Sequence, residues 1–343
     1  MLPERINSVE ELENLLSEPT DGVISVLSEL DGDIMVLGVG GKMGPSLAYM
    51  ALRAFREAGK QNEVIGVSRF TSAEVREKLS KWGVKTIACD LLNEQQVKAL
   101  PDVQNIVFMV GMKFGTTGQE WKTWAINTML PAIVCNRFRE SNFVVFSTGN
   151  VYPLTPVVRG GSTEIDSPSP IGEYAMSCLG RERIFEYFSR EYGTRVAIVR
   201  LNYAVELRYG VLVDLAKKVL SGEEIDLTMG AFNAIWQGDA VAMALQCFSY
   251  VSSPPFIINI TGPETVSVKR VCEEFGRLMG RQVKFVGEEA PDALLSNAQL
   301  AHMLFGYPRV SIRRMMLWIS DWLMRGFETW DKPTHFEERS GRF

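Results

Sequence analysis

The sequence has 343 residues, of which 46% are hydrophobic and 22% charged, and its formal net charge is −5 at pH 7. This composition is that of an ordinary globular protein, and the negative charge gives no general attraction to nucleic acids or anionic membranes. No apolar run approaches the roughly 20 residues that span a bilayer, and the start, Met1–Arg5, has no secretory pattern. The five cysteines lack metal-site and redox-motif spacing, which predicts reduced thiols, no metal site and a cytoplasmic location.

Residues 1–32 form a polar preface in which no chemistry is evident. Leu12, Leu15 and Leu16 fit an amphipathic helix over Glu10–Ser17, and Val23–Leu30 fits either a second helix or a strand. We expect this preface to cap the core of the protein.

The run that begins at Asp33 is the most informative part of the chain. A short apolar strand ends at Gly38, and a helix over Met43–Ala58 follows at once, with Pro45 in its first turn. Such a turn presents backbone N–H groups at the positive end of a helix, where a pyrophosphate binds. The run therefore predicts a nucleotide cofactor.

Strands and helices then alternate as far as Arg200. The further predicted strands are Glu63–Val67, Lys85–Cys89, Asn105–Val110, Phe143–Phe146 and Arg195–Arg200. This alternation predicts an α/β fold with a doubly wound parallel Rossmann sheet over residues 33–202. The long helix predicted over Trp121–Ser141 should bend at Pro131.

Beyond Asn202 the alternation loosens into helices mixed with short strands such as Phe256–Ile260. We expect residues 203–328 to form a smaller mixed α/β lobe over the carboxyl ends of the sheet, where substrates bind in such folds. The polar tail, residues 329–343, is either a disordered end or an arm that packs on a partner subunit.

The motifs of this chain resemble, in order, those of the extended short-chain dehydrogenase/reductase family of the sugar epimerase/dehydratase type, over about residues 33–320. The spacing Gly38-x-x-Gly41-x-x-Gly44 is the spacing of that family. The resemblance implies that the cofactor phosphates lie on this turn, including Lys42 and Met43. It also implies that Asp90 and Leu91 contact the adenine ring, although Asp90 alone could equally cap the next helix.

The end of the second strand bears on the choice of cofactor. An acidic residue there would bind the adenosine ribose of NAD, but this chain has Ser68 followed by Arg69. A serine leaves room, and a guanidinium binds a 2′-phosphate through paired donors. The sequence therefore predicts NADP, with NAD as the alternative cofactor, unless Arg69 is only a solvated surface residue.

Two further segments resemble the catalytic motifs of the family. Within Val145–Tyr152, Thr148 corresponds to the hydroxyl that orients the substrate, and within Pro170–Cys178, Tyr174 corresponds to the tyrosine that moves the proton. Cys178 stands where the family has a lysine. Because the ordinary pKa of tyrosine is near 10, a phenolate needs a neighbouring cation to form near neutral pH.

Three explanations for the missing lysine remain open. Another cation substitutes, either Lys113 just after the fourth strand or, less favourably, Arg181 one turn beyond Cys178. Alternatively, Tyr174 acts only as a neutral proton donor, or the protein binds its cofactor without performing the usual chemistry.

The resemblance implies a substrate contact by Asn202. Trp236, in a further segment that resembles the family, suits either stacking on a sugar face or packing in the core, which is commoner for buried aromatics. Nucleotide-sugar members of the family have an arginine in the stretch that corresponds to Met229–Ala234, and none is present here. A smaller polyol, free sugar or sugar acid therefore fits better than a nucleotide sugar.

The sequence thus predicts an NAD(P)-dependent oxidoreductase or epimerase that acts on a carbohydrate-like alcohol or ketone by hydride transfer. The alternative is an NAD(P)-binding sensor or scaffold of diminished activity. A homodimer through the helices Trp121–Ser141 and Glu173–Tyr192 is expected by analogy.

Overall fold

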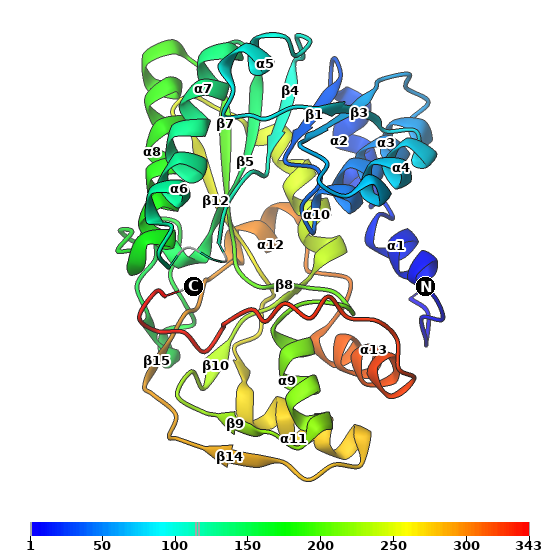
Figure 1. Cartoon of the computed structure of the whole chain (residues 1–343), viewed down its shortest axis with the longest axis vertical. Helices are drawn as coiled ribbons and strands as arrows, with labels where there is room; N and C mark the ends of the chain where they lie inside the picture. The colour runs from blue at the N-terminus through cyan, green and yellow to red at the C-terminus, as the bar shows by residue number, and fades with distance from the viewer. Residues whose placement is uncertain (1, 114, 116, 343) are drawn as a thin grey trace.

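The computed structural model describes residues 2–113, 115 and 117–342. Positions 1, 114, 116 and 343 lie outside the described residues. The centre of the molecule is a sheet of seven strands in the order β12-β7-β5-β4-β1-β2-β3, which Figure 1 shows in its upper half. Every pairing in this sheet is parallel. The strands are β1 (Ile34–Leu37), β2 (Val64–Ser68), β3 (Lys85–Ala88), β4 (Asn105–Phe108), β5 (Asn142–Thr148), β7 (Val196–Leu201) and β12 (Phe256–Ile260). The predicted doubly wound parallel sheet is confirmed.

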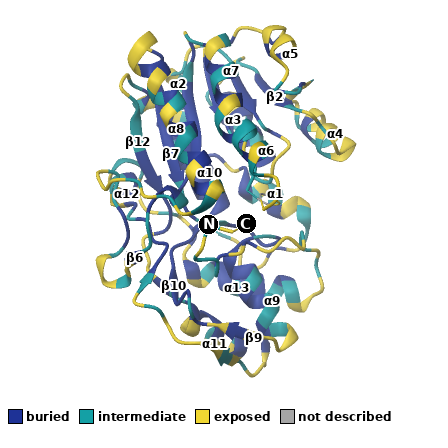
Figure 2. Ribbon diagram, turned by 60° about the vertical axis from the view of Figure 1, so that its left-hand side comes forward, coloured by how far each residue is buried: buried dark blue, intermediate teal, exposed yellow. Residues whose placement is uncertain are grey.

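Helices cover both faces of the sheet because successive side chains of a strand point to opposite sides. In β1, Ile34 and Val36 pack in one apolar cluster, and Met35 and Leu37 pack in another. The helices in the first cluster are α2 (Asp21–Glu29), α3 (Gly44–Glu57), α4 (Ala73–Trp82), α10 (Gln237–Gln246) and α12 (Gln299–Phe305); those in the second are α5 (Glu94–Lys98), α7 (Leu130–Arg137) and α8 (Gly172–Tyr192). Figure 2 shows the strands as buried and α4 as largely exposed at the rim.

The location expected for Phe256–Ile260 needs a correction. This segment is not part of the smaller lobe but is β12, the edge strand of the large sheet, where Ile258 lies opposite Val199 of β7. Helix α10, which also follows Asn202, packs against α2 and α3 of the sheet layer. Strand β12 and helix α10 both carry buried apolar residues, with which they cover an edge and a face of the large sheet. The sequence did not reveal that the chain returns to the sheet, because strands and helices no longer alternate regularly after Asn202.

The long helix predicted around Pro131 is interrupted rather than simply bent. Helix α6 (Glu120–Trp124) passes into a π-helical turn, Ala125–Met129, and α7 then begins with Pro131 in its first turn. A proline is tolerated in the first turn of a helix because no intrahelical partner is needed for its missing N–H. The π-helical turn places Asn127 toward the protein interior.

The preface consists of two helices, α1 (Val9–Leu16) and α2, which removes the alternative of a strand. The hydroxyls of Ser8 and Thr20 cap them by accepting bonds from Glu11 N and Val23 N. Helix α2 packs on the sheet, whereas Leu12 and Leu16 of α1 belong to the core of the smaller lobe.

The smaller lobe lies beyond the carboxyl ends of the strands (Figure 1). Its apolar core lies between three helices and includes Trp236, Phe275 and Trp322. The helices are α9 (Val211–Ser221), α11 (Val268–Met279) and α13 (Ile312–Met324). Short pairs complete it: β8 (Ala204–Val205) with β11 (Ile235–Trp236), β9 (Glu224–Asp226) with β14 (Lys284–Val286), β10 (Ala231–Phe232) with β13 (Val266–Ser267), and β6 (Thr155–Pro156) with β15 (Asp292–Ala293).

The tail packs on the rest of its own chain. The described part, residues 329–342, which we call the C-terminal strap, crosses the molecule between the sheet and the smaller lobe (Figure 1, red). Its Phe336 is 1% exposed and lies in the core of the smaller lobe. Among the described residues, none of the helices combines the length and the apolar character that a membrane crossing requires.

Candidate active site

The glycine turn between β1 and α3 lies at the carboxyl edge of the sheet, as the sequence predicts. Gly38 has φ +88°, which a residue with a side chain rarely adopts, and a Cβ there would lie 3.0 Å from Val110 N. A Cβ at Gly44 would overlap the Val39 carbonyl oxygen. Gly40 and Gly41 are exposed. The turn is therefore compact on the protein side and open on the other, which fits the close approach of a phosphate group.

A cleft of about 530 Å³ extends from this turn along the ends of β2, β3 and β4. The predicted cofactor residues that line it are Gly38, Gly41, Ser68, Arg69, Asp90 and Leu91. The Ser68 hydroxyl faces Gly40, since a Cβ on that glycine would lie 2.7 Å from Ser68 Oγ. Arg69 is exposed at the rim. The residues present thus fit the adenosine half of a dinucleotide, with a cation near its ribose.

Asp90 does not cap the helix that follows it. The N-cap of α5 is Asn93, whose side chain accepts bonds from Gln95 N and Gln96 N. Asp90 Oδ1 instead accepts from Leu92 N at 3.1 Å and shapes the loop that borders the cleft.

Tyr174 and Thr148 meet where β5 ends and α8 begins. Thr148 is the last residue of β5, and Tyr174 lies in the first turn of α8. Burial raises the pKa of Tyr174 well above 10, while the hydrogen bond with Thr148 and the charge of Arg181 lower it less strongly. The phenol therefore stays protonated at neutral pH and is a proton donor.

Cys178 lies one helical turn beyond Tyr174 and is 1% exposed. Burial raises the pKa of its thiol, so this residue supplies no charge to the tyrosine. The buried cation nearby is Arg181, whose Nη1 donates to Phe146 O at 2.8 Å and whose Nη2 donates to Asn127 Oδ1 at 2.9 Å. The charge of Arg181 lowers the pKa of Tyr174, although less strongly than burial raises it.

Lys113 is the other of these cations, and it lies nearby. Its Nζ is 5.9 Å from the centroid of the Tyr174 ring and donates to Thr334 O of the C-terminal strap at 3.3 Å. Burial lowers the pKa of Lys113 to about 8, and the charge of the Asp214 carboxylate opposes this shift.

Asn127 is a site residue that the sequence analysis missed. It is fully buried in the π-helical turn, and its Nδ2 donates to Ser177 Oγ at 2.9 Å and to Met112 O at 3.0 Å. Its Oδ1 accepts from Met112 N at 2.8 Å and from Arg181. Asn127 therefore fixes the loop that carries Lys113 against α8. An amide within an apolar helix was the available signal, because a buried amide needs partners.

The two predicted substrate residues have different surroundings. Asn202 is 3% exposed and lies against Gly149, where a Cβ would be 3.1 Å from Asn202 Cγ. Trp236 is wholly buried, and its ring packs on Trp318 with centroids 5.4 Å apart. The prediction that Trp236 contacts substrate is therefore not supported, because this indole fills the core where α10 begins.

Lys42 and Met43 complete the glycine turn. Met43 is the N-cap residue of α3, and the Lys42 side chain extends over the ring of Tyr209, with Nζ 3.2 Å from its centroid. All five cysteines are free and buried. In the described part of the chain, no group of three His, Cys, Asp or Glu residues is arranged to hold a metal ion.

Comparison with known families decides the class of protein. The model of the NAD dependent epimerase/dehydratase family matches residues 34–229, more than half of the chain. The chain belongs to this family. No curated protein matches the sequence.

Solved structures of this family share the fold. UDP-glucose 4-epimerase with UDP-glucose from Thermotoga maritima is 16% identical, with a TM-score of 0.69 over 85% of this chain and 99% of that one. UDP-glucuronic acid 4-epimerase from Bacillus cereus in complex with NAD is 17% identical, with a TM-score of 0.70 over 85% and 99%. dTDP-glucose 4,6-dehydratase from Streptomyces venezuelae with NAD bound is 17% identical, with a TM-score of 0.71 over 86% and 97%. Part of this chain thus has no counterpart in those structures.

Proposed function

We propose that this protein is an NAD(P)-dependent oxidoreductase or epimerase that acts on a carbohydrate-like alcohol or ketone by hydride transfer. The observation that carries the proposal is the meeting of Tyr174 and Thr148 beside a cleft formed by a glycine turn. The family supports it, and the structural neighbours named above act on sugars or bind NAD according to their names.

The cofactor would supply the hydride acceptor or donor, which is the difficult part of the chemistry. The backbone of Gly41, Lys42 and Met43 would hold its phosphates at the start of α3, and Asp90 and Leu91 would border its adenine. Arg69, exposed at the rim of the cleft, supports a preference for NADP, since its guanidinium is free to turn toward a 2′-phosphate.

In this proposal, Thr148 orients the reacting oxygen of the substrate and Tyr174 gives it a proton. The raised pKa of Tyr174 favours a neutral donor over a phenolate base, and a neutral donor suffices for the reduction of a carbonyl. Arg181 supplies a nearby positive charge that the family lysine would otherwise provide, and Lys113 Nζ lies 5.9 Å from the centroid of the Tyr174 ring. Asn202, beside Gly149, is placed to contact the substrate.

A second function, a cofactor-binding sensor or scaffold, is favoured by one observation. Cys178 is a buried thiol of raised pKa in the position of the family lysine, and it neither holds a ribose nor carries charge. Both functions require cofactor binding, and they differ only in whether a substrate is changed.

One experiment separates the two functions. The absorbance of the nicotinamide is followed while NADPH or NADH is mixed with a panel of ketoses, keto acids and aldoses. The oxidised cofactors are tested in the same way with alcohols and sugar acids. Proton NMR of the sugars detects epimerisation in which the cofactor is recycled. We expect turnover by the wild type that is absent in Tyr174→Phe. Tight cofactor binding without any change in substrate or absorbance would instead support the sensor.

We also propose a homodimer through α6, α7 and α8. Large apolar side chains are exposed on or next to these helices, namely Trp121, Met129, Met176 and Tyr187. A pair of such surfaces would remove this apolar area from water, and sedimentation equilibrium should give twice the mass of the chain.

A further inference from the structure

The C-terminal strap is held along its length by the smaller lobe. Trp330 N donates to Arg208 O at 3.0 Å, and the lysines of α9, Lys217 and Lys218, pair with Asp331 and Glu337 of the strap. Because backbone, ionic and apolar contacts all hold it in place, the strap is an integral wall of the space between the sheet and the smaller lobe.

The strap also covers the stretch that nucleotide-sugar enzymes of the resembled type would use for a diphosphate. Phe336 packs on Phe232 with ring centroids 6.2 Å apart, and Phe232 is 0% exposed. Arg339 donates to Thr228 O at 3.4 Å and to Asp292 O at 3.0 Å. With Phe232 covered, a bulky substrate group has no access to this surface.

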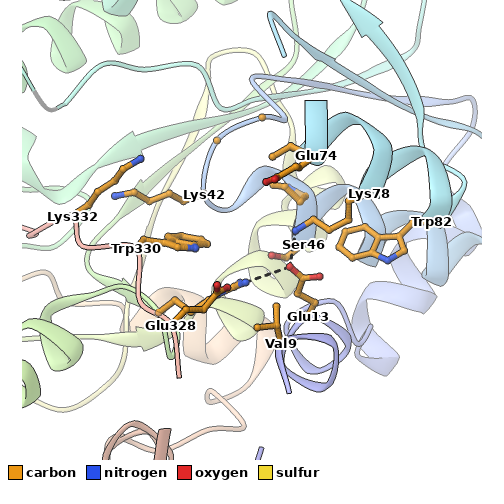
Figure 3. Close-up of a pocket in the computed structure, with 15 residues that line it drawn as sticks. Val9, Glu13, Lys42, Ser46, Glu74, Lys78, Trp82, Glu328, Trp330 and Lys332 are labelled. Carbon is orange, nitrogen blue, oxygen red and sulfur yellow. Dashed lines mark hydrogen bonds and ion pairs between the residues drawn. The ribbon is translucent and has the colours of Figure 1, made fainter. Parts of the chain in front are cut away.

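Three lysines from remote parts of the chain converge at the edge of this space. Lys42 comes from the glycine turn, Lys113 from the loop after β4 and Lys332 from the strap. Figure 3 shows the ammonium ends of Lys42 and Lys332 side by side above Trp330. Lys42 and Lys332 line a cavity of about 550 Å³ together with Gly41. Lys113 Nζ donates to the carbonyl oxygen of Thr334, which lies two residues beyond Lys332 in the strap.

The three ammonium groups lie close enough for Lys332 and Lys113 to lower the pKa of Lys42, while Glu13, Glu74 and Glu328 also line the cavity. The carboxylates whose fields reach Lys42 are Asp214 and Glu206. Asp214 Oδ2 already accepts two hydrogen bonds from Thr334, at 2.7 Å to its N and 2.6 Å to its Oγ1. Glu206 pairs with Arg208 at 3.2 Å. Burial, followed by the charges of Lys332 and Lys113, lowers the pKa of Lys42 to about 7.

We propose that Lys42, Lys113 and Lys332 together bind the carboxylate of a small sugar acid, with the strap supplying the third cation and limiting the size of the substrate. This inference rests on the proposed function, because it identifies the substrate class of the same site. A carboxylate among three ammonium groups forms charge-assisted hydrogen bonds and relieves the repulsion between the cations. Lys113, 5.9 Å from the Tyr174 ring centroid, brings this anion site next to the proton donor.

The test compares matched pairs of five- and six-carbon sugar acids with the sugar alcohols of the same configuration. Binding is measured by isothermal titration calorimetry on the wild type, Lys332→Met and Lys332→Arg, with and without saturating NADP⁺. We expect at least one acid to bind the wild type about tenfold or more tightly than its alcohol, as one charge-assisted hydrogen bond allows. Lys332→Met should remove that ratio, and Lys332→Arg should restore most of it.

Lys217→Met is the matched control, because it removes an ion pair with the strap and leaves the three lysines in place. Its ratio of acid to alcohol binding should equal that of the wild type. The proposal is overturned if no acid binds more tightly than its alcohol. It is also overturned if Lys332→Met and Lys332→Arg lose the preference for the acid equally, or if Lys332→Met weakens NADP⁺ binding and leaves the preference for the acid unchanged. Since Lys332 is exposed, these variants should fold.

The same titrations separate failure of this inference from failure of the proposed function. If NADP⁺ and NAD⁺ both fail to bind but the acids still bind in a manner that depends on Lys332, the hydride-transfer function is wrong and the anion site stands. If the cofactor binds and acids show no preference, the anion site is wrong and the proposed function stands.

Discussion

The two walls of the cleft are built in opposite ways. The cofactor wall comes from short contiguous segments at strand ends, such as Gly38–Gly44 and Ser68–Arg69, each fixed by its own strand and turn. The opposite wall is assembled from residues far apart in the sequence: the side chain of Lys42 leaves the glycine turn and lines a second cavity with Lys332, and Lys113, at the edge of the first cleft, contacts the strap. The first wall is a general feature of the fold, whereas the second carries the features particular to this chain. Specificity should therefore depend on the strap and its neighbours.

The largest expected effect concerns Tyr174, whose ring centroid lies 5.9 Å from Lys113 Nζ. Tyr174→Phe removes the proton donor and should lower kcat by about 10²- to 10⁴-fold, the usual contribution of general acid catalysis. The Kd of the cofactor should change less than about twofold, because the phenol is not part of the cofactor wall. Steady-state kinetics and calorimetry on the same preparation test this. Retained turnover would show that Tyr174 is not the donor.

The second prediction tests whether the strap is structural. Phe336→Ala should reduce the free energy of unfolding by about 3 kcal/mol, because it leaves a cavity in the core of the smaller lobe. Urea denaturation followed by tryptophan fluorescence measures the change. His335→Ala, at the exposed neighbouring position, should cost much less. Equal effects of the two substitutions would mean that the strap does not pack as described.

The third prediction concerns the cofactor wall alone. Arg69→Ala should raise the Kd of NADP⁺ by about 10- to 100-fold, as loss of one or two charge-assisted bonds to a phosphate implies. The Kd of NAD⁺ should hardly change. Direct titration with both dinucleotides measures this, and a variant that still prefers NADP⁺ would assign the 2′-phosphate to another residue.

The smallest expected effect is a pH dependence that belongs only to the second wall. Burial and neighbouring cations lower the pKa of Lys42 to about 7 and burial lowers that of Lys113 to about 8, so both amines lose charge as the pH rises through this range. Because a carboxylate needs the ammonium forms, the affinity for a sugar acid should fall severalfold between about pH 7 and pH 8. Lys332 adds to the positive field at Lys42, and Asp214 and Glu206 reduce it.

The matching sugar alcohol is the control for this pH dependence. Its affinity should stay constant across the same range, since it carries no charge. Calorimetry at several pH values gives both curves, and a constant affinity for the acid would contradict the assignment of the lysines.

The sequence predicted the cofactor wall well because its determinants are local. A strand that ends in glycines and continues into a helix specifies both the turn and its position at the sheet edge, so Gly38 was found from nearby residues alone, whereas Asp90 was found by resemblance. Tyr174 and Thr148 were found by resemblance. They make contact because Thr148 ends β5 at the carboxyl edge of the parallel sheet, where α8 begins with Tyr174 in its first turn.

The rest depended on contacts between distant segments. Strand β12 returns to the sheet after a long excursion through the smaller lobe, which no local pattern records. Arg181 and Asn127 meet across 54 positions of sequence, and spacing along the chain does not reveal that contact. Trp236 was placed in the site because an aromatic residue in that motif suits either a sugar or a core, and here it joins the core.

The central claim is that a pyridine dinucleotide binds on the glycine turn, and calorimetric titration with NADP⁺, NADPH, NAD⁺ and NADH tests it most directly. Gly41→Glu is the informative variant, since Gly41 is exposed and a Cβ there would have one close neighbour, Gly38 O at 3.3 Å. The account predicts that the wild type binds at least one of the four and that the variant binds it at least about tenfold more weakly, because its carboxylate repels the phosphates. No binding of any dinucleotide to the wild type, or equal binding by the variant, would contradict it.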